Sequence, residues 1–391
     1  MSRRLVCALG LFAALLGAEP EVWPPAKLGQ YFRPPAEWSG DFGPYRSPLI
    51  FDDGRRVSTV AAWAERRREL LAFWQAALGP WPERLNQPRL AFLERRERGA
   101  GVVEHRIELE VAAGVMQHAY LLQPAGTGPH PAVIIVFYAP EVSVGYDGPR
   151  PLTGQAAKFM SAGDRGRDRD FALQLAQRGF ITLALGTPGD DAYHPDLHGA
   201  SCQPLAYYAG MASNALTALA QRPEVDSRSI GIMGHSYGGK WALFASCFDE
   251  RFACAVWSDP GIVFDESRGA VNYWEPWYLG WQPGPARRPG LVTTTNPRTG
   301  PYRELVAAGR DLHELHALMA PRPFLVSGGA EDTPARWRAL NHALAVNHLL
   351  GFDDRVAMTN REHHAPNAES NSQAFEFLAG WLKRASRDAP P

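Results

Sequence analysis

The sequence predicts an α/β fold with a doubly wound, mostly parallel sheet. From Pro131 onward, short apolar runs alternate with amphipathic segments. Pro131–Tyr138 is continuously apolar, as expected of a central strand buried on both faces. Before it, 101–111 and 115–123 alternate like paired strands across a turn at Ala113-Gly114. Helices that join parallel strands make right-handed crossovers, so we expect a doubly wound sheet with an antiparallel start.

The other elements follow in chain order. Residues 58–78 have helical periodicity, and we expect Ser58 or Thr59 to cap this helix and Gly79-Pro80 to end it. Later predicted helices cover 169–178, 205–221, 237–248, 334–348 and 372–383. Predicted strands cover 180–185, 229–233, 253–258, 323–327 and 355–359.

The N-terminus predicts export. A basic start, an apolar run from Leu5 to Leu16 and a small-residue cleavage site at Gly17-Ala18 outline a signal peptide over 1–18. The apolar run is too short to span a bilayer, so we expect a secreted or periplasmic protein with no stable membrane insertion after signal removal. The alternative is a buried N-terminal helix.

The remaining 19–391 are predicted to form a single domain, because no linker divides them. Residues 19–100 hold an N-terminal arm, expected to be extended over 19–46, and the first helix. Residues 261–315 interrupt the alternation with a Trp-rich, then Pro/Gly-rich stretch that includes Trp274, Trp277 and Trp281. So long an insertion before a core strand is typical of a lid or a pocket wall.

The composition of the chain argues against some classes of function. The 391 residues carry a net charge of −1, which argues against nucleic-acid partners. Cys202, Cys247 and Cys254 remain after signal removal, and either two of them pair or all three are buried thiols. No Cys/His cluster has zinc spacing, so we infer no metal, and we expect no cofactor.

Gly234-His235-Ser236-Tyr237-Gly238 stands between a predicted strand and a predicted helix. In a strand–turn–helix context, Gly-x-Ser-x-Gly is the nucleophile elbow of α/β-hydrolases, where the tight turn strains the serine and exposes its hydroxyl. The alternative is an ordinary glycine-rich turn. We predict Ser236 as a nucleophile.

The serine needs a base, and the base needs an acid that orients it. In this fold, the chain order is serine, acid, histidine, each at the carboxyl end of a strand. Asp332 and His364 satisfy both the order and the topology, and we predict them as acid and base. His363 is the alternative base. Glu331 and Asp259 are the alternative acids, although Asp259 before Pro260 reads more simply as a turn residue.

The developing oxyanion needs backbone donors. We predict the N–H of Tyr237 and one from the loop after the third strand, at Tyr138 or Ala139. Lys240, one helical turn beyond Ser236, could place a cation at the pocket mouth or simply be solvated. Trp274, Trp277 and Trp281 could stack on a sugar ring or pack a small core of their own.

These motifs together resemble the glucuronoyl esterases and the acetyl xylan esterase-like, dienelactone hydrolase-related α/β-hydrolases. The resemblance runs from about Gly54 to Leu382. It is carried by Asp53-Gly54-Arg55, Leu78-Gly79-Pro80, Arg222 through Lys240, Phe248 through Phe252, Asn272-Tyr-Trp274 and Ala320 through Gly328.

The resemblance implies a serine hydrolase of carbohydrate-linked esters, with Ser236 as nucleophile, His364 as base, and Lys240 and Trp274 in contact with sugar. Glucuronoyl esterases typically have Arg directly after the nucleophile, where this sequence has the uncharged Tyr237. Acetyl and uronate esters of plant polysaccharide both stay open as substrates. The alternatives are a serine peptidase of the prolyl oligopeptidase type and a non-catalytic carbohydrate-binding protein of the same fold.

Overall fold

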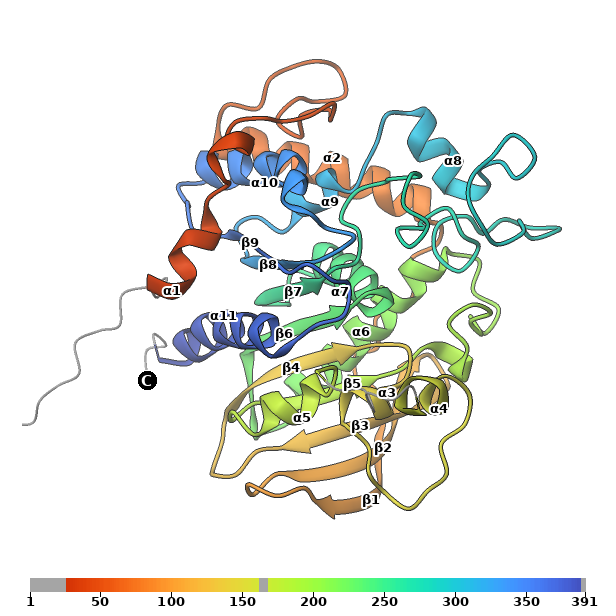
Figure 1. The fold of residues 1–391 in the computed structure, drawn as a ribbon, viewed down its shortest axis with the longest axis vertical. Coiled ribbons are helices and arrows are strands. Elements are labelled where there is room, and N and C mark those ends of the chain that lie inside the picture. The colour runs from red at the N-terminus through yellow and green to blue at the C-terminus, as the bar shows by residue number, and fades with distance from the viewer. Residues whose placement is uncertain (1–25, 162–167, 388–391) are drawn as a thin grey trace, which may run out of the picture.

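The computed structural model describes residues 26–161 and 168–387 (Figure 1). The predicted signal peptide, with Cys7, and residues 19–25 of the arm lie outside these ranges. The strands form one nine-stranded sheet in the order β1-β2-β3-β5-β4-β6-β7-β8-β9. The pairs from β1 to β5 are antiparallel, and those from β5 through β4 to β9 are parallel. The predicted doubly wound sheet with an antiparallel start is therefore confirmed.

The strands are β1 (Leu90–Glu97), β2 (Val103–Ala112), β3 (Val115–Gln123), β4 (His130–Val136), β5 (Ile181–Leu185), β6 (Val225–His235), β7 (Cys254–Ser258), β8 (Phe324–Gly328) and β9 (Val356–Asn360). The helices are α1 (Ala26–Gly29), α2 (Val60–Leu78), α3 (Pro140–Ser143), α4 (Gly154–Ser161), α5 (Phe171–Ala176), α6 (Pro204–Ala220), α7 (Tyr237–Phe248), α8 (Gly300–Ala307), α9 (His313–Leu318), α10 (Trp337–Leu349) and α11 (Ala368–Arg387).

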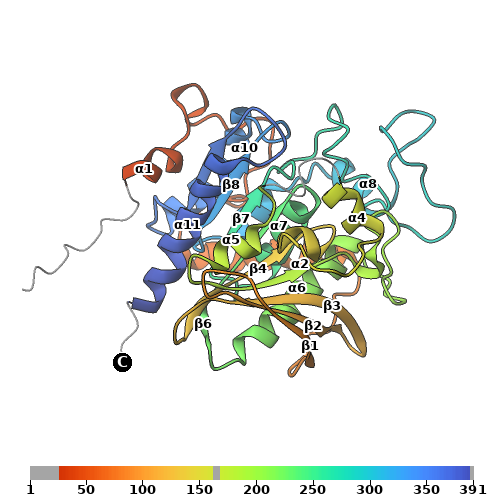
Figure 2. The ribbon, with the colours of Figure 1, turned by 60° about the horizontal axis from the view of Figure 1, so that its bottom comes forward.

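Helices cover both faces of the sheet (Figures 1 and 2). Alternate residues of β4 face opposite ways. Ile134 and Val136 belong to the core that α2, α6, α7 and α10 cover, while Val133 and Ile135 belong to the core that α5 and α11 cover. Burial on both faces explains why this strand is continuously apolar.

Most elements form where their residues predict. Thr59 caps α2 by accepting the N–H of Ala62 at 3.1 Å, and Gly79, at φ 91°, ends the helix. The structure adds β1, α3, α4, α8 and α9, which the sequence did not predict. The arm is not fully extended, because α1 and 3₁₀ turns at Gln30–Phe32 and Ala36–Trp38 interrupt it.

The three cysteines Cys202, Cys247 and Cys254 are all buried and unpaired. This agrees with the alternative of three buried thiols. Within 26–161 and 168–387, no helix has the length and apolar character needed to cross a membrane.

Candidate active site

Ser236 lies between β6 and α7 in a backbone conformation rare for a residue with a side chain. Its φ of 56° and ψ of −117° are the strained geometry expected of a nucleophile elbow. The flanking glycines are a steric requirement. A Cβ on Gly234 would lie 2.1 Å from the carbonyl oxygen of Gly238, and one on Gly238 would lie 1.9 Å from that of Val136. Only glycine fits at these two positions, so the spacing of the motif follows from the tightness of the turn.

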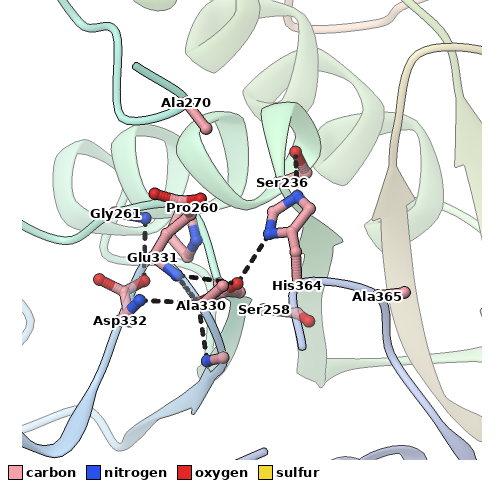
Figure 3. A network of polar contacts seen from close by, with 12 residues as sticks. Ser236, Ser258, Pro260, Gly261, Ala270, Ala330, Glu331, Asp332, His364 and Ala365 are labelled. Atoms are coloured by element: carbon pink, nitrogen blue, oxygen red, sulfur yellow. Dashed lines mark hydrogen bonds and ion pairs between the residues drawn. The ribbon is translucent and has the colours of Figure 1, made fainter. Parts of the chain in front are cut away.

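His364 comes from the loop between β9 and α11, and its ring points at the serine (Figure 3). Its Nε2 lies 2.9 Å from Ser236 Oγ, and its Nδ1 lies 2.7 Å from Asp259 Oδ2. The neighbouring His363 has a side chain that is 79% exposed and lies near Glu362 instead. Of the two candidate bases, the structure brings His364 to Ser236.

Asp332 does not reach His364, and this corrects our prediction of the acid. Its carboxylate is fully buried and accepts the N–H groups of Gly261 at 2.9 Å and Ile262 at 2.7 Å (Figure 3). The residue that bonds His364 is Asp259, for which the sequence favours the role of a turn residue before Pro260. Asp259 does turn the chain, at φ 50°, and in that turn its carboxylate meets the imidazole.

Asp259 is fixed by the loop that carries Asp332. Its Oδ1 accepts the N–H of Gly329 at 2.7 Å, of Asp332 at 2.8 Å and of Glu331 at 3.1 Å. Burial alone would raise the pKa of Asp259, but the hydrogen bond and charge of His364, then the charge of Arg361, hold that pKa below its usual value. Asp259 is therefore a preorganised carboxylate. Burial and the nearby charge of Asp259 raise the pKa of Asp332 to about 6.

Arg361 and His235 support the histidine. Arg361 donates to the carbonyl oxygen of His364 at 2.6 Å and to that of Ser327 at 2.8 Å, so it fixes the histidine loop to β8. His235 is buried, with its Nδ1 3.1 Å from the carbonyl oxygen of Ser258. Burial lowers the pKa of His235 well below its usual value, so it packs beside His364 as a neutral ring. Our sequence reasoning missed Arg361, although it stands three residues before His364.

Two tyrosines flank the nucleophile with opposite orientations. The phenol of Tyr237 is buried and donates to Tyr208 Oη at 2.6 Å. Its Oη also lies 3.2 Å from the carbonyl oxygen of Ala192, so the phenol points into the core. Tyr237 is the first residue of α7, so its backbone N–H has no hydrogen-bond partner within the helix. Burial raises the pKa of the Tyr138 phenol, which follows β4, and the nearby Ser236 hydroxyl opposes that rise. This phenol is a second group of the loop near the nucleophile, besides the backbone N–H groups that the sequence predicts.

A polar network anchors the same loop to the sheet. Glu141 of α3 is buried, and its Oε1 lies 3.3 Å from His118 Nε2, 3.1 Å from an Arg150 nitrogen and 3.3 Å from Tyr120 Oη. Of these groups, His118, Glu141 and Arg150 line a cavity of ≈ 50 Å³ together with Tyr138. Because Glu141 lies three residues after Tyr138, the network holds the loop that faces the nucleophile.

Lys240 and Trp274 do not lie where the resemblance implied. Lys240 is buried, and its ammonium donates to the carbonyl oxygens of Pro260 at 2.7 Å and Ala270 at 3.3 Å. Burial lowers its pKa to about 8. Trp274 is 1% exposed and donates its indole N–H to the carbonyl oxygen of Gly290 at 2.9 Å. The polar groups of both side chains are bonded to backbone carbonyl oxygens inside the protein, so we no longer expect either residue to contact sugar.

The described residues contain no cluster of three His, Cys, Asp or Glu side chains able to hold a metal ion. The chemistry that the arrangement can support is nucleophilic: a strained serine, a histidine within hydrogen-bonding distance, and a buried carboxylate that orients the histidine.

Comparison with solved structures gives the same fold. A glucuronoyl esterase from Solibacter usitatus is 18% identical with a TM-score of 0.66, covering 87% of this chain and 98% of that chain. A glucuronoyl esterase of carbohydrate esterase family 15 from Caldicellulosiruptor kristjansonii is 21% identical with a TM-score of 0.61, covering 88% and 92%. A putative acetyl xylan esterase from Bacteroides fragilis is 15% identical with a TM-score of 0.55, covering 86% and 97%. The resemblance to this group is confirmed at the level of the α/β-hydrolase fold.

No curated protein matches the chain. The model of the prolyl oligopeptidase family matches residues 170–388, which include Ser236, Asp259 and His364. That match spans more than half of the sequence and contains the parallel half of the sheet from β5 onward, apart from β4. The chain therefore belongs to the prolyl oligopeptidase family.

Proposed function

We propose that this protein hydrolyses carboxylic esters, through an acyl-enzyme on Ser236, and that its substrates are carbohydrate-linked esters. The observation that carries the proposal is the position of His364, which lies 2.9 Å from Ser236 Oγ and 2.7 Å from Asp259 Oδ2. This geometry fits a general base within reach of the nucleophile and an acid that fixes the tautomer of the base.

In the proposed acylation step, His364 Nε2 takes the proton of Ser236 as Oγ attacks the ester carbonyl. The imidazolium donates from Nδ1 to Asp259, whose carboxylate stays charged. The backbone N–H groups of Tyr237 and of Tyr138 or Ala139 would donate to the oxyanion, and the nearby phenol of Tyr138 would add a further donor. His364 then gives its proton to the leaving alcohol, and the acyl group remains on Ser236.

In the proposed deacylation step, His364 takes a proton from water as the water attacks the acyl carbonyl. The serine leaves as the acid forms and recovers its proton from His364, which returns the site to its starting state. Every proton transfer uses the same imidazole, and no cofactor is needed.

The substrate class rests on the solved relatives, whose names include glucuronoyl esterase and putative acetyl xylan esterase. The residue after the nucleophile is Tyr237, whose phenol is turned into the core, and the Lys240 ammonium is bound to carbonyl oxygens. Neither group offers a charge to the substrate. We therefore favour acetyl and other neutral esters over uronate esters. The proposal includes export after removal of 1–18, and a pocket wall formed by 261–315.

The test is hydrolysis of p-nitrophenyl acetate, followed by a screen of acetyl xylan, acetylated sugars and methyl glucuronate esters. Wild-type protein is expected to turn over the acetyl substrates, and Ser236→Ala is expected to abolish turnover. Retained activity in the alanine variant would exclude Ser236 as the nucleophile.

Family membership favours one second candidate, a serine peptidase, because the family carries the name of an oligopeptidase. The same Ser236, His364 and Asp259 would serve an amide. Prolyl peptide substrates separate the two candidates. We expect ester hydrolysis to exceed peptide hydrolysis in kcat/KM, and the reverse order would make peptidase the function.

A further inference from the structure

The third tryptophan of the 261–315 segment differs from the other two. Trp274 and Trp277 are 1% and 7% exposed, whereas Trp281 is only partly buried. Among the described residues, the Trp281 ring stacks on no other aromatic ring, and its indole N–H makes no hydrogen bond to protein. Its backbone, by contrast, is tightly held, because it exchanges hydrogen bonds with the side chain of Gln203 at 3.0 and 3.2 Å. The backbone of Trp281 is therefore held in place, while its indole N–H is left without a hydrogen-bond partner in the part of the protein that the structure describes.

Trp281 lines an open pocket of ≈ 270 Å³ where four parts of the chain meet. These are the end of α2, the turn before α6, the stretch from Trp281 to Pro283, and the start of α8. The volume is close to the lower end of the range for small-ligand sites, about 300–1,000 Å³. The polar residues of the pocket are Ser201, Gln203, Gln282, Arg303 and Glu304.

The chemistry of this lining selects a neutral, hydroxyl-rich ligand. Arg303 and Glu304 are both exposed and lie 3.4 Å apart, so their charges offset each other and give no net attraction for an ion. The amide nitrogen of Gln282 and the hydroxyl of Ser201 add donors beside the indole. An aromatic face flanked by such groups suits a sugar ring, whose apolar C–H face stacks while its hydroxyls hydrogen-bond.

The pocket is separate from the catalytic centre but close to it along α6. Gln203, which holds the Trp281 backbone, directly precedes the first residue of α6. Tyr208 follows five residues later, about 7.5 Å along the helix, and its hydroxyl accepts from Tyr237, the residue after the nucleophile. A chain molecule bound at Trp281 would thus be kept near Ser236, which raises its effective concentration there.

We propose that the Trp281 pocket is a non-catalytic binding site for a neutral oligosaccharide. The choice of sugar rests on the proposed function, but binding itself does not require turnover. The ligand would stack on the exposed part of the indole and hydrogen-bond to Gln282 and to the Arg303–Glu304 pair.

The test is calorimetric titration of the full chain with unsubstituted xylohexaose, which carries no ester. We expect Trp281→Ala to weaken binding at least about tenfold and Trp281→Phe, which keeps an aromatic face, to stay within about threefold of wild type. Leu291→Ala is the matched control, because Leu291 is an exposed apolar residue of the same segment that does not line the pocket. Leu291→Ala is expected to bind as wild type does.

Two results overturn the inference: no binding by wild type up to about 10 mM xylohexaose, or equal binding by wild type and Trp281→Ala. Hydrolysis of p-nitrophenyl acetate is measured on the same samples. Ester hydrolysis without Trp281-dependent binding would remove this site and leave the proposed function standing. Trp281-dependent binding without ester hydrolysis would keep this site and remove the proposed function.

Discussion

Asp259 Oδ1 accepts the backbone N–H of Asp332 at 2.8 Å, and Asp332 in turn binds the chain just beyond Asp259 through the N–H groups of Gly261 and Ile262. The loops after β7 and β8 are therefore joined by hydrogen bonds in both directions, each through a buried carboxylate. Only one of these carboxylates, that of Asp259, also contacts His364. Both aspartates hold the two loops together, but only Asp259 also orients the histidine, and substitutions can distinguish these two roles.

Asp259→Asn is expected to lower kcat on p-nitrophenyl acetate by about 10³–10⁴-fold, because an amide cannot stabilise the imidazolium and favours the wrong tautomer. Asp332→Asn is the matched control. It removes the second acid without touching the histidine, and we expect a loss of about tenfold or less in kcat together with a lower Tm. A larger kcat loss in Asp332→Asn than in Asp259→Asn would reverse our assignment of the acid.

The two adjacent histidines make a second pair of variants. His364→Gln is expected to remove essentially all turnover, because its imidazole is the group that lies against Ser236. His363→Gln is expected to retain kcat within about twofold, since surface substitutions away from special contacts have small effects. Steady-state rates on p-nitrophenyl acetate decide this, and the opposite order of activities would make His363 the base.

Tyr138→Phe and Tyr237→Phe each delete one phenol oxygen near the nucleophile. Tyr138→Phe is expected to lower kcat by about 10²-fold, because its phenol lies near the Ser236 hydroxyl and we propose that it donates to the oxyanion. Tyr237→Phe is expected to keep kcat but to lower the free energy of unfolding by about 1 kcal/mol, because its phenol bonds Tyr208 inside the core. Equal kcat values for Tyr138→Phe and wild type would remove the phenol from the mechanism.

The pKa shifts of Glu141 and His118 predict the pH range in which their contact raises the free energy of unfolding. Burial would raise the pKa of Glu141, but His118 and Arg150 lower it to about 2. Its contribution is thus complete above about pH 4.5 and is lost as pH falls toward 2. The hydrogen bond to Glu141 raises the pKa of His118 despite burial, so that contribution is complete below about pH 6.5 and is lost as pH rises through the raised pKa.

The free energy of unfolding of Glu141→Gln should therefore fall furthest below that of wild type between about pH 4.5 and 6.5. We expect a difference on the order of 3 kcal/mol there. Urea unfolding at several pH values measures it. His118→Asn is the control, and its deficit should fade on the alkaline side. A Glu141→Gln deficit that is constant from pH 3 to 8 would contradict this account.

The sequence predicts the elbow well because its cause is local. Gly234 and Gly238 are required by the turn itself, and the strand and helix on either side have clear patterns. The acid could not be chosen in this way. Asp259 and Asp332 follow neighbouring parallel strands and both reach the same edge of the sheet. What selects Asp259 is its backbone at φ 50°, which no residue pattern reveals.

The direction of two side chains and the weak pattern of one strand account for the other differences between the sequence prediction and the structure. Lys240 and Trp274 lie in the segments that the pattern indicates, yet both are buried and bonded to backbone carbonyl oxygens. The edge strand β1 was missed because Phe92 and Leu93 are about half exposed and charged residues follow them, so its alternation is weak. Each of these features depends on tertiary contacts that a single sequence does not encode locally.

The most direct test of the proposed catalytic site is covalent labelling of the full chain with a fluorophosphonate, read by intact mass and peptide mapping. An activated serine Oγ displaces fluoride rapidly to form the phosphonyl ester. We expect one adduct on Ser236 and no adduct in Ser236→Ala. Labelling should slow by orders of magnitude in Asp259→Asn but stay within about tenfold of wild type in Asp332→Asn. An adduct on another residue, or equal labelling rates for wild type and Asp259→Asn, would contradict the site described here.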